Sequence, residues 1–283
     1  MNLKNSLAQA RGIFKDNNIE SAYLEGELLL RHILGVNRPQ LYMDYDRELS
    51  PSNERDYHSL IDRRLRGEPT AYITGHREFY GLNFYVNRNV LIPRPETEVL
   101  VGKTIGLAQD RAIFTIADIG TGCGAIAISM AVNLPGAKIY ATDISNPALE
   151  VARFNCRRHG VLDRICFLQG NMVEPLPEAV DLIVANMPYV RESELLRTGP
   201  LSFEPVLALS GGTDGLAKIN QLSHQAGKRL RPGGCLLLEI GQGQGKTVET
   251  LLRKVWPSAH IEVATDFSGI ERVVCMCLTQ DFL

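Results

Sequence analysis

The sequence predicts an α/β protein in which a seven-stranded, doubly wound sheet follows a small all-α unit and a β-hairpin. Three observations lead to this fold class. Apolar strand-like runs alternate with helical patterns from Phe114 onward. A glycine-rich turn, Gly120–Gly124, separates the first of these strands from a helix. The residues before the hairpin show helical spacing and no strand pattern. We therefore divide the chain at 1–74, 75–93 and 94–283.

Residues 1–74 are predicted to form a bundle of four helices. Apolar residues recur at helical spacing, and Ser, Asn, Pro and Gly stand where caps are expected, which gives the ranges 3–14, 21–34, 37–42 and 50–67. Residues 1–75 contain ten Lys and Arg against eleven Asp and Glu, hence a charge of −1. A unit that grips nucleic-acid phosphates needs a positive surplus. The bundle is thus expected either to dock a protein or simply to cover the following domain.

The connector alternates large apolar and polar residues from Gly75 to Pro93, with turn residues at Gly81 and at 87–89. This pattern is typical of a hairpin or two short strands. In the next segment, Arg94–Glu98, Thr97 is expected to cap the following helix. The arginine and two carboxylates of this segment have two readings on physical grounds: structural ion pairs, or the mouth of a pocket.

The seven expected strands are short apolar runs separated by helices or turns. Their ranges are 114–119, 138–142, 165–168, 181–185, 236–240, 261–265 and 273–278. In a doubly wound sheet, ligands bind at the carboxyl ends of the strands. The residues that follow the first four strands are therefore the candidate ligand contacts.

Candidate cofactor residues follow the first three strands. Gly120, Thr121, Gly122, Cys123 and Gly124 form a turn that lets a ligand approach the backbone at a helix start. The spacing is G-x-G-x-G, which differs from the G-x-G-x-x-G of nicotinamide cofactors.

Three further candidates lie at the ends of the next two strands. Asp143 ends the second strand, where an acid can accept both hydroxyls of a ribose. After the third strand, Asn171 offers an amide to an adenine edge and Met172 can cover its face.

Asn186, Met187, Pro188 and Tyr189 follow the fourth strand and are the candidate catalytic residues. Pro188 cannot donate to a sheet ladder, so the strand must end here. The tetrapeptide then offers a carboxamide, backbone carbonyls and an aromatic ring. These groups suit a planar –CO–NH2 or aromatic amine, whose hydrogens the oxygens accept while the ring stacks on its plane. The alternative is an ordinary proline turn.

Other features narrow the functional class. The run Gly241–Thr247 hints at a phosphate-binding loop, but Ile240 stands where that motif needs its first glycine. The six cysteines show no metal-ligand spacing, so no metal is expected. Four of them (Cys166, Cys235, Cys275 and Cys277) read as small core residues of a cytoplasmic protein. A net charge of −2 and the lack of an apolar leader or spanning run predict no membrane and no direct nucleic-acid partner.

Taken together, these motifs resemble the HemK/PrmC family over essentially the whole chain. The resemblance rests on the helical unit, Arg94–Glu98, Asp118–Gly124, Asn186–Tyr189 and several later motifs. The later motifs are Glu204-Pro205 with Leu207–Leu209, Gly211–Leu216 and Glu239–Gly241. It implies a class I, Rossmann-like methyltransferase fold and S-adenosyl-L-methionine as cofactor, with S-adenosyl-L-homocysteine as product.

The resemblance also implies an activity: methylation of the glutamine in the Gly-Gly-Gln motif of class I peptide chain release factors, in translation termination. Glycines 120–124, Asp143, Asn171, Met172 and Asn186 would border the cofactor. Asn186–Tyr189 would bind the acceptor glutamine. The chain departs from the family at Met187, where proline is usual, and at Asn171, where aspartate is common. We expect a monomer.

Three alternatives remain open at this point. A glutamine methyltransferase acting on a ribosomal protein would share fold and chemistry. An adenine-amine methyltransferase acting on DNA or RNA would use the same tetrapeptide, although the chain lacks a basic domain. A non-catalytic factor that binds the cofactor or a release factor is the third.

Overall fold

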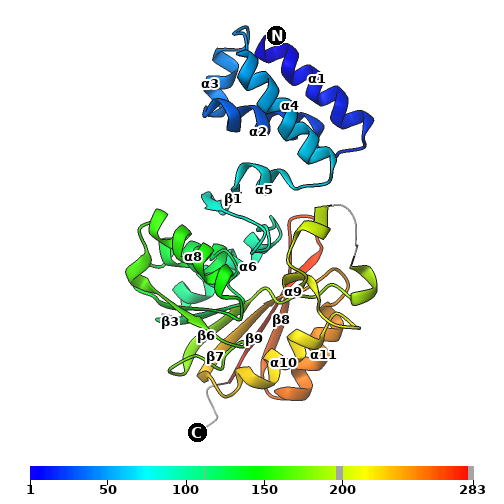
Figure 1. The fold of residues 1–283 in the computed structure, drawn as a ribbon. Helices are drawn as coiled ribbons and strands as arrows, with labels where there is room; N and C mark the ends of the chain where they lie inside the picture. The colour runs from blue at the N-terminus through cyan, green and yellow to red at the C-terminus, as the bar shows by residue number, and fades with distance from the viewer. Residues whose placement is uncertain (112, 196–199, 280–283) are drawn as a thin grey trace. The chain divides into compact units, whose positions relative to one another are not determined.

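The computed structural model describes residues 1–111, 113–195 and 200–279. Its chain forms two compact units, which are described here one at a time (Figure 1). The first contains Met1–His76 and the described part of Leu196–Phe203. The second contains Arg77–Leu195 and Glu204–Leu283, of which the last four residues are not described.

The first unit is helical, and each of its longer helices buries one apolar face. Its helices are α1 (Leu3–Asp16), α2 (Ala22–Leu34), α3 (Arg38–Met43), α4 (Pro51–Leu65), α5 (Thr70–Thr74) and the 3-10 turn η3 (Pro200–Phe203). Phe14, Leu29, Leu30 and Leu41 are completely buried in a shared core. The four expected helices are confirmed, and α5, a single turn without a helical repeat of its own, was not foreseen.

Capping explains where several of these helices begin. Asn37 and Gln40 exchange side-chain and backbone hydrogen bonds in a capping box at the start of α3. The Ser50 hydroxyl accepts from the backbone N–H of Asn53 at the start of α4. Ser21 precedes α2 in a left-handed conformation and makes no such bond, so its expected capping role is wrong.

The expected hairpin is present as β1 (His76–Phe79) and β2 (Leu82–Tyr85). Tyr80 and Gly81 both have positive φ, which a two-residue turn between twisted strands requires. Phe79 and Phe84 are buried, and their rings meet edge to face. The hairpin therefore has one apolar face, which packs into the second unit next to α8.

The second unit is built on a seven-stranded sheet with strand order β5-β4-β3-β6-β7-β9-β8. Its strands are β3 (Thr115–Ile119), β4 (Lys138–Asp143), β5 (Ile165–Gln169), β6 (Val180–Ala185), β7 (Leu230–Glu239), β8 (His260–Thr265) and β9 (Glu271–Cys277). Strands β3 to β7 are parallel, and β9 runs antiparallel to both β7 and β8. The strand order reverses between β3 and β6, which defines the topological switch point.

Helices cover both faces of this sheet. They are α6 (Thr97–Asp110), α7 (Ala125–Asn133), α8 (Asn146–Arg158), α9 (Val206–Leu209), α10 (Ala217–Ala226) and α11 (Gly245–Val255), with 3-10 turns η1 (Leu162–Arg164) and η2 (Glu192–Glu194). Leu236 and Leu238 of β7 share a core with α10 and α11. Because successive side chains of a strand point to opposite faces, Leu237 faces the other layer, where α6 contacts β7 and α7.

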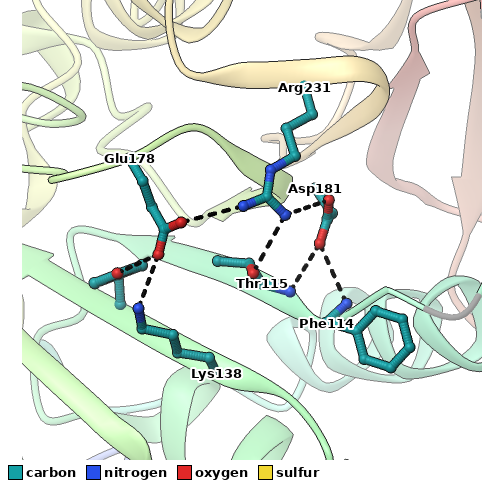
Figure 2. A network of polar contacts seen from close by, with 7 residues as sticks. Phe114, Thr115, Lys138, Glu178, Asp181 and Arg231 are labelled. Atoms are coloured by element: carbon teal, nitrogen blue, oxygen red, sulfur yellow. Dashed lines mark hydrogen bonds and ion pairs between the residues drawn. The ribbon is translucent and has the colours of Figure 1, made fainter.

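A charged network ties the strands together at their amino ends, opposite the ligand edge (Figure 2). The Arg231 guanidinium of β7 donates to Asp181 of β6 (2.9 Å) and to Glu178 (3.2 Å). Asp181 also accepts the backbone N–H groups of Phe114 and Thr115 at the start of β3. Glu178 accepts from Lys138, the first residue of β4. One cluster thus holds four neighbouring strands in register.

The cysteines depart from expectation. Cys235 and Cys277 are joined by a disulfide, with Cα atoms 4.1 Å apart, because β7 and β9 place them directly opposite each other. We expected both as small core residues, and both are buried as expected. Their pairing was not foreseen, because they lie 42 positions apart in the sequence. Cys166, expected in the core, is exposed on β5. Within the described ranges, no helix has both the length and the apolar character needed to cross a membrane.

Candidate active site

The switch point brings the two most informative loops together. Ile119, the last residue of β3, pairs with Ala185, the last residue of β6. The glycine turn begins at Gly120, directly after Ile119, and Asn186 directly follows Ala185. Since parallel strands end at the same edge of the sheet, both loops must open into the same space.

An open pocket lies at this edge, with about 880 Å³ of empty space including its mouth. Eight of the predicted site residues line it: Gly120, Gly122, Asp143, Asn171, Met172, Asn186, Met187 and Pro188. Four others, Thr121, Cys123, Gly124 and Tyr189, are not among the lining residues. The pocket belongs entirely to the second unit.

The glycine turn is held from below by a buried carboxylate. Asp118 is completely buried, and its Oδ2 accepts from the Thr121 hydroxyl (2.7 Å) and from the N–H of Ala127 in α7 (3.1 Å). Burial raises the pKa of Asp118 to about 7, against the lowering effect of these two bonds. Its Oδ1 has no partner in the described part of the chain. Thr121 thus serves to shape the turn, which explains why it does not face the pocket.

Gly120, Gly122 and Gly124 all have positive φ, a conformation that glycine adopts readily. This backbone requirement explains why glycine stands at every second position of the turn. Gly124 must also lack a side chain, since a Cβ there would lie 2.9 Å from Ile128 Cδ1. Cys123 is buried, and its carbonyl accepts from the Asn155 side chain of α8. This pair of residues packs the turn against α7 and α8.

Asp143 connects the second strand to the turn and to the pocket. Its Oδ2 accepts from the N–H of Gly122 and its Oδ1 from the N–H of Ser145, both at 2.9 Å. Burial raises the pKa of this carboxyl, while the N–H groups that it accepts lower it. Each carboxylate oxygen has a second lone pair. Both oxygens therefore keep the capacity to accept a hydroxyl from a ligand.

Asn171 and Met172 border the opposite part of the pocket. The Asn171 Nδ2 donates to Glu174 Oε1 (3.0 Å), so its Oδ1 is the group left to accept from a ligand. Met172 is buried and adopts φ of 52°, and its carbonyl accepts from the Thr142 hydroxyl. A left-handed conformation is uncommon outside glycine and is frequent at ligand sites.

The segment Asn186–Tyr189, which is expected to hold the methyl acceptor, is called the acceptor segment from here on. It begins with Asn186, which is half-buried. Its Nδ2 donates to the Thr97 hydroxyl at 3.0 Å. The Met187 side chain is buried in the sheet core, and its sulfur lies 4.0 Å from the position a Cβ would take at Gly120. Met187 therefore packs the acceptor segment directly against the glycine turn. The expectation that Thr97 caps α6 is wrong, because Glu96 precedes the helix and the Thr97 side chain is committed to Asn186.

Tyr189 lies behind the pocket wall. Its hydroxyl donates to Glu239 Oε1 (3.2 Å), and its ring edge lies 3.1 Å from the position of a Cβ at Gly241. Burial and the Glu239 carboxyl raise its pKa. The Tyr189 carbonyl accepts from the Gln244 Nε2, and the Oε1 of the same side chain accepts from the N–H of Gly241. The apparent phosphate-loop sequence thus serves to hold the acceptor segment.

A second glycine segment, 211–215, supports the same residues from another side. A Cβ at Gly211 would lie 2.7 Å from the Pro188 carbonyl oxygen and 2.8 Å from the Tyr189 Cα. A Cβ at Gly215 would lie 2.5 Å from the Tyr189 carbonyl oxygen. The backbone N–H of Gly211 donates to Val190, which donates in turn to Leu209. Only glycine leaves room for this close backbone approach.

Of the two interpretations of the Arg94–Glu98 segment, the structure supports structural polar contacts and not the mouth of a pocket. Arg94 donates to the buried Glu204 (2.6 Å), and Glu98 accepts from the backbone N–H of Tyr80. None of the three charged residues in the segment lines the pocket. Glu204 instead holds the stretch that leads into Pro205, Leu207 and Ala208, which do line it.

Several lining residues were not foreseen from the sequence. Asn89, Val90 and Leu91 reach the pocket from the connector, Pro205, Leu207 and Ala208 from the α9 region, and Lys218 from α10. Their sequences show an apolar turn and an amphipathic helix, and neither pattern signals a ligand. Glu239, which does not line the pocket but bonds to Tyr189, could have been noticed in the sequence, because it is an acidic residue at the end of a buried strand. In the described ranges, no group of three or more His, Cys, Asp or Glu residues is placed to hold a metal ion.

Comparison with known proteins identifies the relatives of this chain. Residues 5–75 match the PrmC N-terminal domain family and residues 100–198 the methyltransferase small domain family. A release factor glutamine methyltransferase of Moorella thermoacetica is 42% identical over 96% of this chain and 97% of its own. One of Bordetella pertussis is 41% identical over 88% and 93%.

The solved structures agree on the fold. A methyltransferase of Pyrococcus furiosus, 17% identical, superposes with a TM-score of 0.53 over 77% of this chain and 97% of its own. This likeness concerns the fold alone, whereas the two sequence relatives extend over both units. The chain therefore belongs to the release factor glutamine methyltransferase family.

Proposed function

We propose that this protein transfers a methyl group from S-adenosyl-L-methionine to the side-chain nitrogen of a glutamine in a class I release factor. One observation carries the proposal: the glycine turn after β3 and the Asn186–Pro188 segment after β6 line one pocket. A methyl donor and a planar amide need to meet in this way. The names of the relatives supply the substrate class.

The lining residues fit the donor chemically. The glycine turn lets a ligand lie against its backbone, Asp143 can accept two ribose hydroxyls, and Asn171 Oδ1 can accept from an adenine amine. The Asp118 Oδ1 beneath the turn is buried and has no hydrogen-bond partner among the described residues, although Asp118 itself does not line the pocket. S-adenosylmethionine, when bound, supplies a methyl group activated by its sulfonium.

The acceptor segment would bind the glutamine amide through two oxygens. Asn186 Oδ1 is one, because Nδ2 is already bonded to Thr97. The Met187 carbonyl is the other: the Pro188 carbonyl is covered by Gly211, while no hydrogen bond reaches the Met187 oxygen within the described ranges. An amide nitrogen is a poor nucleophile because its lone pair is delocalised. The two oxygens would fix the nitrogen and stabilise the positive charge that grows on it as the N–CH3 bond forms and the S–CH3 bond of the donor breaks. The nitrogen would then release one proton to water, leaving the methylated amide and S-adenosyl-L-homocysteine.

The family usually has proline at position 187, and proline fixes φ. In this chain the position is Met187, whose buried side chain restrains the backbone instead. Its side chain is 7% exposed and fills the core below Gly120. The carbonyl is therefore held by packing, and methionine remains compatible with catalysis. The assignment of Tyr189 as a stacking partner stays a prediction, since its hydroxyl is bonded to Glu239 and its ring is not part of the pocket lining.

The decisive experiment incubates the protein with methyl-labelled S-adenosylmethionine and, separately, a class I release factor, ribosomal proteins, and DNA or RNA. We expect label in the release factor only, and none after Gln→Ala in its Gly-Gly-Gln motif. Label in a ribosomal protein or nucleic acid instead would establish one of the alternative substrates. No label in any acceptor, with cofactor binding intact, would indicate a binding factor without activity.

Two variants separate acceptor from cofactor contacts within the same pocket. Asn186→Ala should lower kcat by roughly a hundredfold or more, as for other lost transition-state hydrogen-bond groups, and leave the cofactor Kd within a few-fold. Asp143→Ala should chiefly raise the cofactor Kd. Turnover that survives Asn186→Ala would remove Asn186 from the mechanism.

A further inference from the structure

The short helix α9 is held at both ends by the structure around it. Before it, the buried Glu204 accepts from Arg94 (2.6 Å) and from the backbone N–H of Ile92 (3.4 Å). At its end, the Leu209 side chain is buried, and the Leu209 carbonyl accepts from the backbone N–H of Val190 (3.1 Å). A single helical turn has little stability of its own. The position of α9 is therefore fixed by these contacts.

The first two residues of this fixed turn expose apolar side chains. Val206 is 65% exposed and Leu207 is 53% exposed. Within the described part of the second unit, they are the only large, exposed apolar residues that are adjacent in the sequence. Single exposed apolar residues are common on protein surfaces, whereas contiguous ones mark interaction sites. The exposed pair on α9 thus has the character of a contact surface.

This exposed pair borders the pocket. Leu207 is a lining residue, as are Pro205 and Ala208 on either side of the pair, whereas Val206 is not among the lining residues. Val190, which is bonded to the last residue of α9, directly follows the acceptor segment. The surface therefore continues from the wall of the pocket next to the segment that would hold the acceptor amide.

A protein substrate needs a surface in this position. A glutamine that belongs to a protein chain enters the pocket by its side chain only, so the main chain on both sides of it lies across the mouth. The Gly-Gly-Gln motif expected of the substrate has no side chain at the two positions before glutamine, and its main chain can therefore approach a wall closely. The side chains of Val206 and Leu207 offer an apolar wall without charges or hydrogen-bonding groups.

We propose that Val206 and Leu207 form the surface that binds the main chain next to the acceptor glutamine. The inference rests on the proposed function and names the part of the substrate protein that α9 contacts. Both side chains serve to bind the substrate and take no part in the chemical step. Their loss should therefore weaken substrate binding and leave the reacting groups in place.

The first test is Val206→Asn, which makes the surface polar without altering the pocket lining. We expect KM to rise roughly tenfold, both for a short peptide containing Gly-Gly-Gln and for the intact release factor, the effect of losing an apolar contact at an interface. The kcat and the cofactor Kd should stay unchanged, because Val206 does not line the pocket. Val132→Asn is the matched control, since Val132 is an exposed valine of α7 in the same unit.

The second test is Leu207→Asn, which separates contact with the substrate from contact with the cofactor. We expect the same rise in both KM values, with the cofactor Kd within a few-fold of wild type. A raised cofactor Kd with unchanged KM values would place Leu207 against the cofactor and overturn its assignment. Leu162→Asn is the matched control, because Leu162 is exposed in the same unit and does not line the pocket.

A photoreactive benzoyl-phenylalanine in place of Val206 locates the bound segment directly. We expect a crosslink to the loop that contains Gly-Gly-Gln when the intact release factor and S-adenosyl-L-homocysteine are present. A crosslink to a second copy of this chain or to a distant part of the release factor would overturn the inference, as would the absence of any crosslink.

The outcomes distinguish this inference from the proposed function. Methylation of the release factor by the wild type, with unchanged KM values in Val206→Asn and Leu207→Asn, would overturn the inference and leave the function standing. Absence of transfer by the wild type to any release factor would overturn both. If the short peptide is not methylated by the wild type, KM for the intact release factor and the crosslink decide.

Discussion

Asp118 is the residue whose burial has the clearest cost. It carries a completely buried carboxyl whose Oδ1 has no partner in the described part of the chain, and its pKa is about 7, compared with 3.8 for the free side chain. Such a group binds a proton in the folded state at pH values where the unfolded chain has released it. Folding stability must therefore fall as pH rises between about 4 and 7. The carboxyl is kept because its other oxygen shapes the cofactor turn.

Asp118→Asn should remove this pH dependence. Asparagine can accept the same bonds from Thr121 and Ala127 and stays neutral. Since one pKa unit corresponds to about 1.4 kcal/mol, the variant should gain at most about 4 kcal/mol relative to wild type across the window. Chemical denaturation at several pH values measures this, with the exposed Asp163→Asn as control. An identical pH slope in Asp118→Asn and wild type would contradict the assignment.

At the scale of elements, the 211–215 glycine segment matters more than its lack of secondary structure suggests. It packs backbone to backbone against Pro188 and Tyr189, and Gln244 completes the enclosure from the start of α11. The acceptor segment has no regular structure of its own after β6. Its shape is thus imposed by neighbouring loops, each distant in sequence.

Gly211→Ala tests this imposed shape. The added Cβ would lie 2.7 Å from the Pro188 carbonyl oxygen and must displace it. We expect kcat to fall roughly tenfold or more, since small displacements of positioning groups have large effects, with the cofactor Kd nearly unchanged. Gly106→Ala is the control, because nothing lies within 4 Å of its Cβ position in α6. Equal activity of the two variants would show that the segment is not a support.

At the scale of the whole molecule, the chain forms two compact units. The second unit contains the whole pocket, so the first is not needed to build it. The first unit exposes apolar side chains on α2 and α3, where the Tyr23 and Tyr42 hydroxyls are hydrogen-bonded and Met43 is 84% exposed. We propose that this surface docks the substrate protein, since exposed apolar groups of this kind mark interaction sites.

Met43→Glu should therefore raise KM for an intact release factor by roughly tenfold, the effect of losing an apolar anchor. KM for a short peptide containing Gly-Gly-Gln, and the cofactor Kd, should not change. Val132→Glu is the control, an exposed apolar residue of α7 in the other unit. If the helical unit serves only as a cover, Met43→Glu will leave both KM values as they are.

The sequence by itself determined the elements and the residue types at the ligand edge. Helical spacing located α1 to α4, and the strand–glycine–helix pattern located β3 and α7, because these signals depend on neighbouring residues only. The carboxyl-end rule then assigned Asp143 and Asn186 to one edge, where both line the pocket.

The tertiary structure alone decided which distant residues meet there. Thr97 looked like a helix cap and instead bonds to Asn186, and Gln244 looked like part of a phosphate loop and instead holds Tyr189. Cys235 and Cys277 became a pair only through the register of β7 and β9. The physical reason is the same in each case. A local pattern fixes what a segment becomes, whereas its partners depend on strand order and packing, which no short stretch of sequence encodes.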